Sequence, residues 1–238
     1  YHFIWHSYCD WYVELIKPTL SDKNSAIASE IKATASTILV GTLRLLHPFM
    51  PYLTEELNQK IFQSDDMLIA AGWPQATSGS DSEAVNDIQF LISLITEIRH
   101  IRSEMNVPLS AKPVLQARGM TAAQAAVTQS QSAALMRLAR LSGVSIVDQF
   151  AKGTARGSVD GADIGLPLAD ILDLDAEAAR LKKDIGGVEI EIKKISGKLD
   201  NPNFLAKAPD DVVAENRRRL EDEQIKLDGL TAALRRLA

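Results

Sequence analysis

The sequence contains a single cysteine, Cys9, among its 238 residues. One cysteine excludes an internal disulfide and fits a reducing compartment, so we expect the protein in the cytoplasm. A signal peptide and an apolar run long enough to cross a bilayer are also missing, and we expect no membrane partner. The chain begins without methionine inside a helical pattern, so we expect it to be a C-terminal fragment of a longer protein.

Motifs for catalysis and metal binding are missing as well. The chain has no glycine-rich phosphate loop, no nucleophile triad and no carboxylate pair in a known catalytic motif. His2 and His6 have the helical i, i+4 spacing of zinc ligands, but no second pair of ligands accompanies them. Cys9 lies beside Asp10, whose charge would not stabilise a thiolate. We therefore predict no catalytic residue, no metal site and no cofactor in this chain.

Positive charge is not in excess. The formal net charge is −5, with 26 Lys and Arg against 31 Asp and Glu, which excludes a globally basic nucleic-acid binder, and we expect no DNA partner. Half of the basic residues, 13, lie in residues 174–238, where 13 acidic residues accompany them. Any contact with RNA must therefore come from local basic patches.

The first 108 residues show helical periodicity, because their apolar residues recur at steps of three and four. Pro18 is expected to end the first helix and Ser21 to cap the second. The expected helices span residues 2–17, about 22–47, 51–62 and 83–106, with a loop over 63–84. Together they predict a helical bundle of four helices over residues 1–108, truncated at its N-terminus.

A tight corner is predicted between the second and third helices. Pro48 disfavours a helix before it, so the second helix should end near His47, and Pro51 suits the first position of the third helix. Apolar side chains crowd this stretch, and we expect a buried core corner made of Leu45, Leu46, Phe49, Met50, Leu53 and Leu57.

From Lys112 onward the apolar period changes. Thr121 is the expected cap of a helix, and Asp160-Gly161 is the expected turn of a β-hairpin. The expected elements are strands at 113–117, 144–147, 155–159 and 164–168, and one helix at 122–141. Residues 109–172 are therefore predicted to form a small α/β connecting domain.

Residues 173–238 have the clearest periodicity of the chain. Apolar residues follow alternating steps of four and three in two runs separated by residues 201–209. This pattern predicts an antiparallel coiled-coil hairpin, and the chain as a whole is predicted to be mainly α. The two seams are Leu174, Ala178, Leu181, Ile185, Val188, Ile192, Ile195 and Leu199, and Val213, Asn216, Leu220, Glu223, Leu227, Leu230, Leu234 and Leu237.

Three short stretches are distinctive. Residues 47–57 are His-Pro-Phe-Met-Pro-Tyr-Leu-Thr-Glu-Glu-Leu, residues 9–14 are Cys-Asp-Trp-Tyr-Val-Glu, and residues 98–107 are Ile-Arg-His-Ile-Arg-Ser-Glu-Met-Asn-Val. The first resembles the anticodon-binding domain of class I aminoacyl-tRNA synthetases for branched aliphatic amino acids. The other two are similar to the valyl-tRNA synthetase family. Asn58 departs from the family, which usually has a tryptophan there.

The resemblance implies a function in tRNA recognition. A chain of this kind would be the C-terminal part of a valine–tRNA ligase, and would position tRNA for an ATP- and Mg²⁺-dependent reaction catalysed elsewhere in the parent enzyme. The family's nucleotide-binding motifs, His-x-Gly-His and Lys-Met-Ser-Lys-Ser, are absent from this sequence. The implied partner is tRNA, specifically tRNA-Val, and the expected state is a monomer.

Two groups of residues are candidates for RNA contact. Arg99 and Arg102 are expected to share one face of the fourth helix, and Asn106 follows Arg102 at i+4; the alternative is a solvated or ion-paired helix face. Basic clusters also lie off the seam of the hairpin, where the alternative is an ordinary charged coiled-coil flank. The hairpin candidates are Lys193, Lys194, Arg217, Arg218 and Arg219.

Two other functions fit parts of the pattern. The hairpin helices could instead pair between chains, which would make this a structural or dimerisation module. Among the synthetases, the equivalent region of an isoleucyl-tRNA synthetase is the main alternative to the valyl family, but that family usually carries a C-terminal zinc ribbon, which one cysteine cannot build.

Overall fold

The computed structural model describes residues 2–22, 25–63, 66–75, 79 and 81–236. The chain folds into two compact units, Tyr1–Val85 and Asn86–Ala238. This division lies earlier in the chain than the boundary predicted at residue 108, and it assigns most of the fourth helix to the second unit. The three-domain boundaries stay a prediction.

The first unit is helical throughout its regular elements. Its first helical segment is hydrogen-bonded to residues 28–46, which form α2. The hydroxyls of Tyr8 and Tyr12 donate to the carbonyls of Ala35 and Ile31 at 3.1 and 3.4 Å. The elements are the π-helix η1 (Phe3–Tyr12), α1 (Val13–Ser21), α2 (Ala28–Leu46), α3 (Pro51–Phe62) and the short 3₁₀ helix η2 (Leu68–Ala70).

Two predicted details of the first helices are wrong. Pro18 lies inside α1 and does not end it. Proline removes one N–H but fixes φ at a helical value, so one further turn can follow it. Ser21 does not cap α2, because its hydroxyl donates to the carbonyl of Lys17 in its own helix at 2.8 Å. Helix α2 begins at Ala28 without a side-chain cap.

The corner between α2 and α3 has the predicted helix ends but not the predicted core. Thr54 is buried, and its hydroxyl lies 2.8 Å from Nδ1 of His47 across the corner. The apolar side chains face solvent instead, because two helices bury only the inner side of a corner and the described residues place no third layer over the outer side. The exposed residues are Leu45, Leu46, Phe49, Met50 and Leu53.

The second unit contains a four-stranded sheet in the order β2-β1-β4-β3. Strands β1 and β2 are parallel, and the β1–β4 and β4–β3 pairs are antiparallel. The predicted hairpin is confirmed, with Asp160 and Gly161 both at positive φ in its turn. The strands are β1 (Val114–Arg118), β2 (Gly143–Ile146), β3 (Thr154–Val159) and β4 (Ala162–Pro167).

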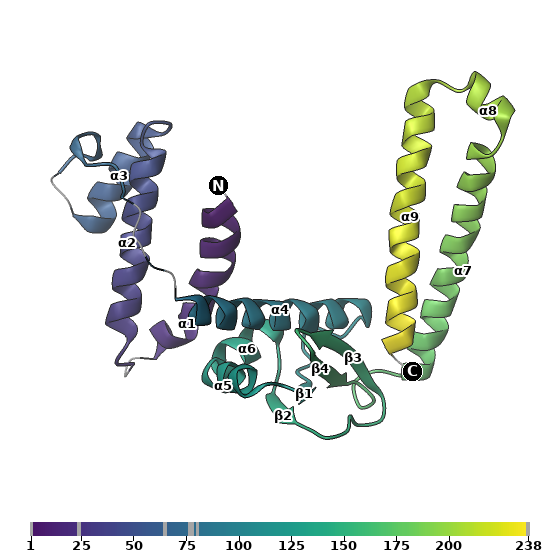
Figure 1. The fold of residues 1–238 in the computed structure, drawn as a ribbon, viewed down its shortest axis with the longest axis horizontal. Helices are drawn as coiled ribbons and strands as arrows, with labels where there is room; N and C mark the ends of the chain where they lie inside the picture. The colour runs from purple at the N-terminus through teal and green to yellow at the C-terminus, as the bar shows by residue number, and fades with distance from the viewer. Residues whose placement is uncertain (1, 23–24, 64–65, 76–78, 80, 237–238) are drawn as a thin grey trace. The chain divides into compact units, whose positions relative to one another are not determined.

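Helix α4 (Ser82–Glu104) packs its apolar side against this sheet (Figure 1). Gly157 of β3 makes the close approach possible, because a Cβ there would lie 2.6 Å from Oε1 of Glu97 and 3.0 Å from Cδ1 of Ile101. The predicted buried side of the helix is confirmed: Phe90, Leu91, Leu94, Ile95, Ile98, Ile101 and Met105 are all buried.

The helix predicted over residues 122–141 is two helices, α5 (Ala122–Ser130) and α6 (Ser132–Ala139). Thr121 caps α5 as predicted, in a reciprocal capping box with Gln124. The break follows Thr128 and Ser130, whose hydroxyls donate back to carbonyls of their own helix. Such bonds bend helices, which explains why one periodic run forms two elements.

The last segment is the antiparallel hairpin that the heptads predict (Figure 1). Helices α7 (Leu174–Leu199) and α9 (Asp210–Arg236) lie side by side, and the short α8 (Pro202–Lys207) forms part of the turn. Every predicted seam residue that the structure describes is buried or half-buried, including the polar Asn216. Leu237 falls outside the described residues. We call this hairpin, residues 174–236, the arm.

Candidate nucleic-acid interface

Arg99 and Arg102 line a cavity of about 320 Å³ at the C-terminal ends of α4 and α6. Nε of Arg99 donates to the carbonyl of Leu138 at 3.0 Å. The helical spacing of three residues places both arginines on one face of α4, as the sequence predicted. We call this the arginine cavity; its lining is Arg99, Arg102, Ser103, Val107, Leu109, Leu138, Ala139 and Arg140.

Arg102 is the buried arginine of the cavity, with 7% of its surface exposed. Its guanidinium donates to the carbonyls of Arg140, Pro108 and Ala111 at 3.3, 3.1 and 2.9 Å. Burial, and then the charge of Arg140, lower the pKa of Arg102 below its usual range. This placement gives Arg102 a structural role in closing the loop after α4, and argues against a direct contact with phosphate.

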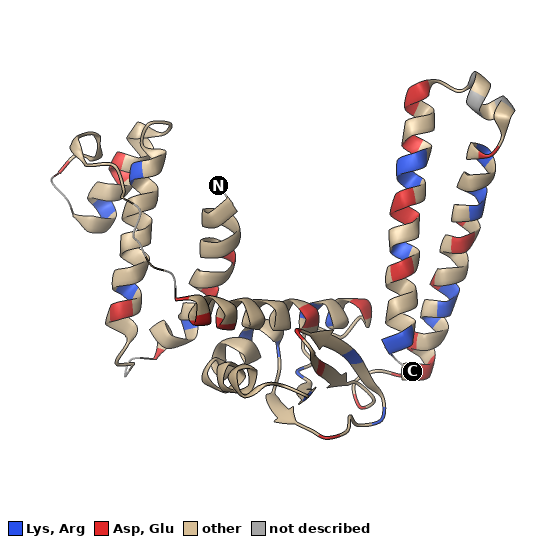
Figure 2. Ribbon diagram, viewed as in Figure 1, with Lys and Arg blue, Asp and Glu red and all other residues tan. Residues whose placement is uncertain are grey.

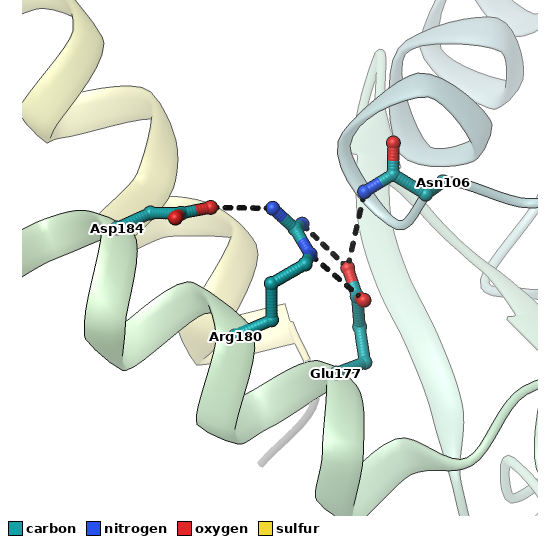
Figure 3. A network of polar contacts seen from close by, with 4 residues as sticks. All are labelled: Asn106, Glu177, Arg180 and Asp184. Atoms are coloured by element: carbon teal, nitrogen blue, oxygen red, sulfur yellow. Dashed lines mark hydrogen bonds and ion pairs between the residues drawn. The ribbon is translucent and has the colours of Figure 1, made fainter.

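Asn106 belongs to a different cluster, at the base of the arm (Figure 3). Its Nδ2 lies 3.5 Å from Oε1 of Glu177, at the limit of a hydrogen bond. Arg180 donates to both oxygens of Glu177 at 3.0 and 2.6 Å and to Asp184 at 2.5 Å. The hydrogen bond from Arg180 to Glu177 is the main cause of a raised pKa at Arg180. Asn106 therefore links the loop after α4 to the first turns of α7.

A second cluster, which the sequence analysis missed, also lies at the base of the arm, at the end of α9. Nη1 of Arg236 lies 2.7 Å from Oε1 of Glu97, and its Nε lies 3.2 Å from Oε2 of Glu104. Arg236 is 19% exposed at its side chain, so this pair is largely shielded from water. The i+7 spacing of Glu97 and Glu104 places both carboxylates on one face of α4, and this was the sequence signal for a cation-binding pair. The spacing could not identify Arg236 as the partner, because Arg236 lies 139 residues from Glu97.

The basic candidates of the arm are all exposed. Lys and Arg residues occur along both helices of the arm, interspersed with Asp and Glu (Figure 2). Arg219 of α9 reaches Glu191 of α7 at 3.1 Å, and Lys194 reaches the same glutamate at 3.4 Å. Arg218 pairs with Glu215 at 3.3 Å. Exposed pairs of this kind contribute only about 0–1 kcal/mol, so a phosphate can replace the carboxylate easily.

Lys193 and Arg217 are the least engaged of these candidates. Each is exposed, and neither makes an ion pair or a hydrogen bond within the described part of the chain. The Glu191–Arg219 ion pair joins the two helices. Lys193 lies two residues after Glu191, and Arg217 lies two residues before Arg219, so both lie two residues nearer the turn than the pair. Because the helices are antiparallel, Lys193 and Arg217 lie at the same level of the arm. The five arm candidates therefore lie at about the same level of the arm, and none of them lines the arginine cavity.

Exposed aromatic side chains gather in the first unit, and sequence reasoning did not identify them. Phe49, Tyr52 and Trp73 are 82%, 91% and 59% exposed. Tyr52 borders one of two neighbouring cavities and Trp73 the other, and both cavities are lined by His47, Pro51 and Ile69. We call Phe49, Tyr52 and Trp73 the aromatic corner. Exposed rings are the platforms on which proteins stack unpaired bases.

Asn58, the departure from the family motif, is a structural residue here. It is 5% exposed, and its Nδ2 donates to the carbonyl of Asp66 at 3.3 Å. Asn58 therefore connects α3 to the loop that follows it.

Metal ligands do not gather among the described residues: no three His, Cys, Asp or Glu side chains lie close enough to hold an ion. His2 and His6 stack their rings at 5.4 Å, and Cys9 is exposed. None of the described helices is long and apolar enough to cross a membrane.

Two family profiles match the chain. Residues 1–117 match the anticodon-binding domain of tRNA ligases, and residues 173–238 match the tRNA-binding arm of valyl-tRNA synthetases. The whole chain is 43% identical to part of the valine–tRNA ligase of Caulobacter vibrioides and 42% identical to part of that of Zymomonas mobilis. It covers 27% of the length of each, so the chain spans about a quarter of these relatives.

Proposed function

Because the chain belongs to the valyl-tRNA synthetase family, we propose that it is the C-terminal, tRNA-binding part of a valine–tRNA ligase. The observation that carries this proposal is the arm: residues matched to a tRNA-binding arm form a long hairpin with exposed basic clusters on its surface. A seam buried within one chain supports a monomer, and one exposed cysteine supports the cytoplasm.

In this proposal the arm binds the folded body of a tRNA through its backbone. Folded RNA presents phosphates and 2′-hydroxyls on its outside, and a rod with exposed cations can lie against them without reading bases. Lys193 and Arg217 have no ion pair to give up among the described residues, so they are the first cations available to phosphate. Lys194, Arg218 and Arg219 exchange weak surface pairs for phosphate contacts.

In the same proposal, the aromatic corner binds the anticodon. Unpaired anticodon bases can leave the loop stack and rest on aromatic rings, at about 1–3 kcal/mol for each stacked base. Tyr52 and Phe49 have the most exposed rings of the corner, and Arg44 lines the cavity beside Trp73, where it can meet a neighbouring phosphate. Base stacking supplies affinity, whereas the choice among bases needs hydrogen bonds to their edges.

The chemical step belongs to the rest of such an enzyme. A valine–tRNA ligase would use ATP and Mg²⁺ to join valine to tRNA-Val, and the described residues here offer no cluster that fits Mg²⁺. The contribution of this chain is binding energy at a distance from the reacting atoms. That energy places the 3′ end of the tRNA at the catalytic centre.

The test is binding of this chain to a panel of purified tRNAs over a series of salt concentrations. Replacing Arg217 and Arg218 by alanine should weaken binding of every tRNA similarly, and should reduce the slope of log K against log salt by roughly 0.7–0.9 for each lost phosphate contact. Replacing Lys182 and Lys183 removes the same charge near the base of the arm and is the matched control, with a smaller expected change of slope.

Any of three results would count against the proposal. Failure of the unaltered chain to bind any tRNA would reject the function as a whole. An unchanged slope and affinity after the Arg217 and Arg218 substitutions would mean that these arginines only solvate a coiled-coil flank. A loss confined to one tRNA species would mean that the arm reads sequence.

A further inference from the structure

The face of the sheet that points away from α4 carries exposed side chains. Gly157 of β3 faces α4, and its neighbours Arg156 and Ser158 point to the other side, because successive residues of a strand alternate. Both neighbours are exposed, and so is Arg118 of β1. Arg118 and Ser158 are each paired in register with Asp163 of β4, so they share this face. We call this side of the sheet the open face.

An aromatic ring is fixed on the open face. The ring of Phe150 lies over Gly165 of β4, where an added Cβ would come within 3.1 and 3.2 Å of two ring carbons. The next residue of the same loop, Ala151, is anchored twice: its N–H donates to Oε1 of Gln116 at 3.0 Å, and its carbonyl accepts from the hydroxyl of Thr154 at 2.7 Å. The sheet therefore holds Phe150 in place without a ligand.

Two arginines accompany this ring. Cζ of Arg118 lies 5.3 Å from the centre of the Phe150 ring and Cζ of Arg156 lies 5.5 Å from it, both within reach of a cation–π interaction. Arg118 also donates to Asp163 from Nε and Nη2, at 3.2 and 2.5 Å. The side chain of Arg156 makes no ion pair or hydrogen bond within the described part of the chain. Its contact with Phe150 orients the guanidinium and leaves its N–H donors unused there.

This arrangement suits a phosphate of an RNA backbone. The N–H groups at the edge of a guanidinium match the paired oxygens of a phosphate, and an arginine over an aromatic ring keeps that edge accessible. Unlike the paired cations of the arm, Arg156 gives up no carboxylate on binding. A small anion would need enclosure, which an exposed face does not give. The open face also adjoins the base of the arm, since Nη1 of Arg236 lies 3.5 Å from the carbonyl oxygen of Arg156.

We propose that the open face is a further RNA-contact surface of this chain, in which Arg156 binds a backbone phosphate of the tRNA. Phe150 is a positioning residue, because it touches the guanidinium and not the phosphate. Arg118 keeps its bond to Asp163 and adds positive charge beside the ring. The proposal rests on the proposed function, since it takes the same tRNA as its ligand, and it adds a contact separate from the arm clusters and the aromatic corner.

Binding of purified tRNA over a series of salt concentrations tests the role of Arg156. Arg156→Gln should weaken binding and reduce the slope of log K against log salt by roughly 0.7–0.9, the value for one lost phosphate contact. Arg156→Lys keeps the charge but loses the fork, so it should keep the slope and weaken binding less. Lys112→Gln removes an exposed charge of the second unit outside the strands and is the matched control, with slope and affinity unchanged.

Phe150→Leu separates the orientation of the guanidinium from its charge. Leucine keeps an apolar side chain over Gly165 but offers no ring to Arg156. The expected result is weaker tRNA binding with an unchanged salt slope, because the number of charges is the same. Unchanged backbone amide spectra of β3 and β4 show that the sheet is intact in this variant. Full affinity in both Phe150→Leu and Arg156→Gln would mean that the arginines only cover the ring, and would overturn the proposal.

A direct measurement distinguishes failure of this proposal from failure of the proposed function. Addition of tRNA to the isotope-labelled chain should shift the side-chain Nε resonance of Arg156. Binding of tRNA without that shift, and with an unchanged slope in Arg156→Gln, would overturn the open face and leave the proposed function intact. A saturable shift with inorganic phosphate and none with tRNA would assign the face to a small anion and reject RNA as its ligand. Failure of the unaltered chain to bind any tRNA would reject both proposals.

Discussion

Arg99 and Arg102 lie one helical turn apart on the same face of α4, yet their surroundings differ. Arg102 is buried and bonded to three carbonyls, whereas Arg99 is exposed at the mouth of the arginine cavity. A buried arginine of this kind stabilises the loop, since its loss leaves carbonyls without donors. At the scale of the residue, burial distinguishes an arginine with a structural role, Arg102, from an arginine that is a candidate for RNA contact, Arg99.

Replacing Arg102 by leucine should lower the free energy of unfolding of the second unit by about 3 kcal/mol, because three carbonyls lose their donor in a largely dry site. Hydrogen exchange of the amides in β1 and α6 measures this, with Arg99→Gln as the control at about 0.5 kcal/mol or less. Unchanged protection combined with a shallower salt slope in tRNA binding would instead make Arg102 a phosphate contact.

The arm is the element whose structure follows most directly from its heptads. Leu181, Val188 and Ile195 are almost fully buried on the seam of α7, and Ile190, opposite the seam, is 71% exposed. Asn216 is a polar exception, and its Nδ2 donates to the carbonyl of Val212 in its own helix at 2.8 Å. The seam therefore needs a partner helix, and α9 of the same chain supplies it.

Spin labels should show that this pairing is intramolecular. Cysteines replacing Lys183 and Lys226, in a background where Cys9 is serine, should give a short distance, on the order of 20 Å, because packed helix axes lie about 10 Å apart. The measurement is double electron–electron resonance on the doubly labelled chain diluted with unlabelled protein. A short distance seen only in mixtures of singly labelled chains would support the dimerisation module instead.

At the scale of the whole molecule, the arm is attached to the rest of the second unit at the base of both of its helices. Glu177 of α7 meets Asn106, and Arg236 of α9 meets Glu97 and Glu104 (Figure 3 shows the first contact). Gly157 keeps this junction close, because a Cβ there would meet Glu97 and Arg236. These contacts set the direction of the arm relative to α4 and the sheet.

Arg236→Gln should loosen that direction without removing a phosphate contact. We expect faster hydrogen exchange in the last turns of α9, and tRNA binding weakened by about fivefold, since a looser arm has more freedom to lose on binding. The salt slope should not change. Arg235→Gln removes the same charge from the exposed neighbour and is the control; equal effects of both variants, with a shallower slope, would make Arg236 an RNA contact.

The sequence alone determined the local features of this protein. The bounds of α3, the capping box at Thr121, the hairpin turn at Asp160-Gly161 and the seams of the arm all depend on residues within a few positions of one another. Periodicity, capping and turn chemistry act over that range, and the family motifs lie within it too.

Only the tertiary structure decided which side chains are available for function. Arg102 is buried by a loop and by α6, Arg236 finds its carboxylates more than 130 residues away, and Phe49 faces solvent where a core was predicted. Burial and pairing depend on what packs over a residue, and that neighbour comes from a distant part of the chain. Helical spacing placed Arg99 and Arg102 on one face of α4. Only the packing around them showed that Arg102 has a structural role and that Arg99 is exposed and available for RNA contact.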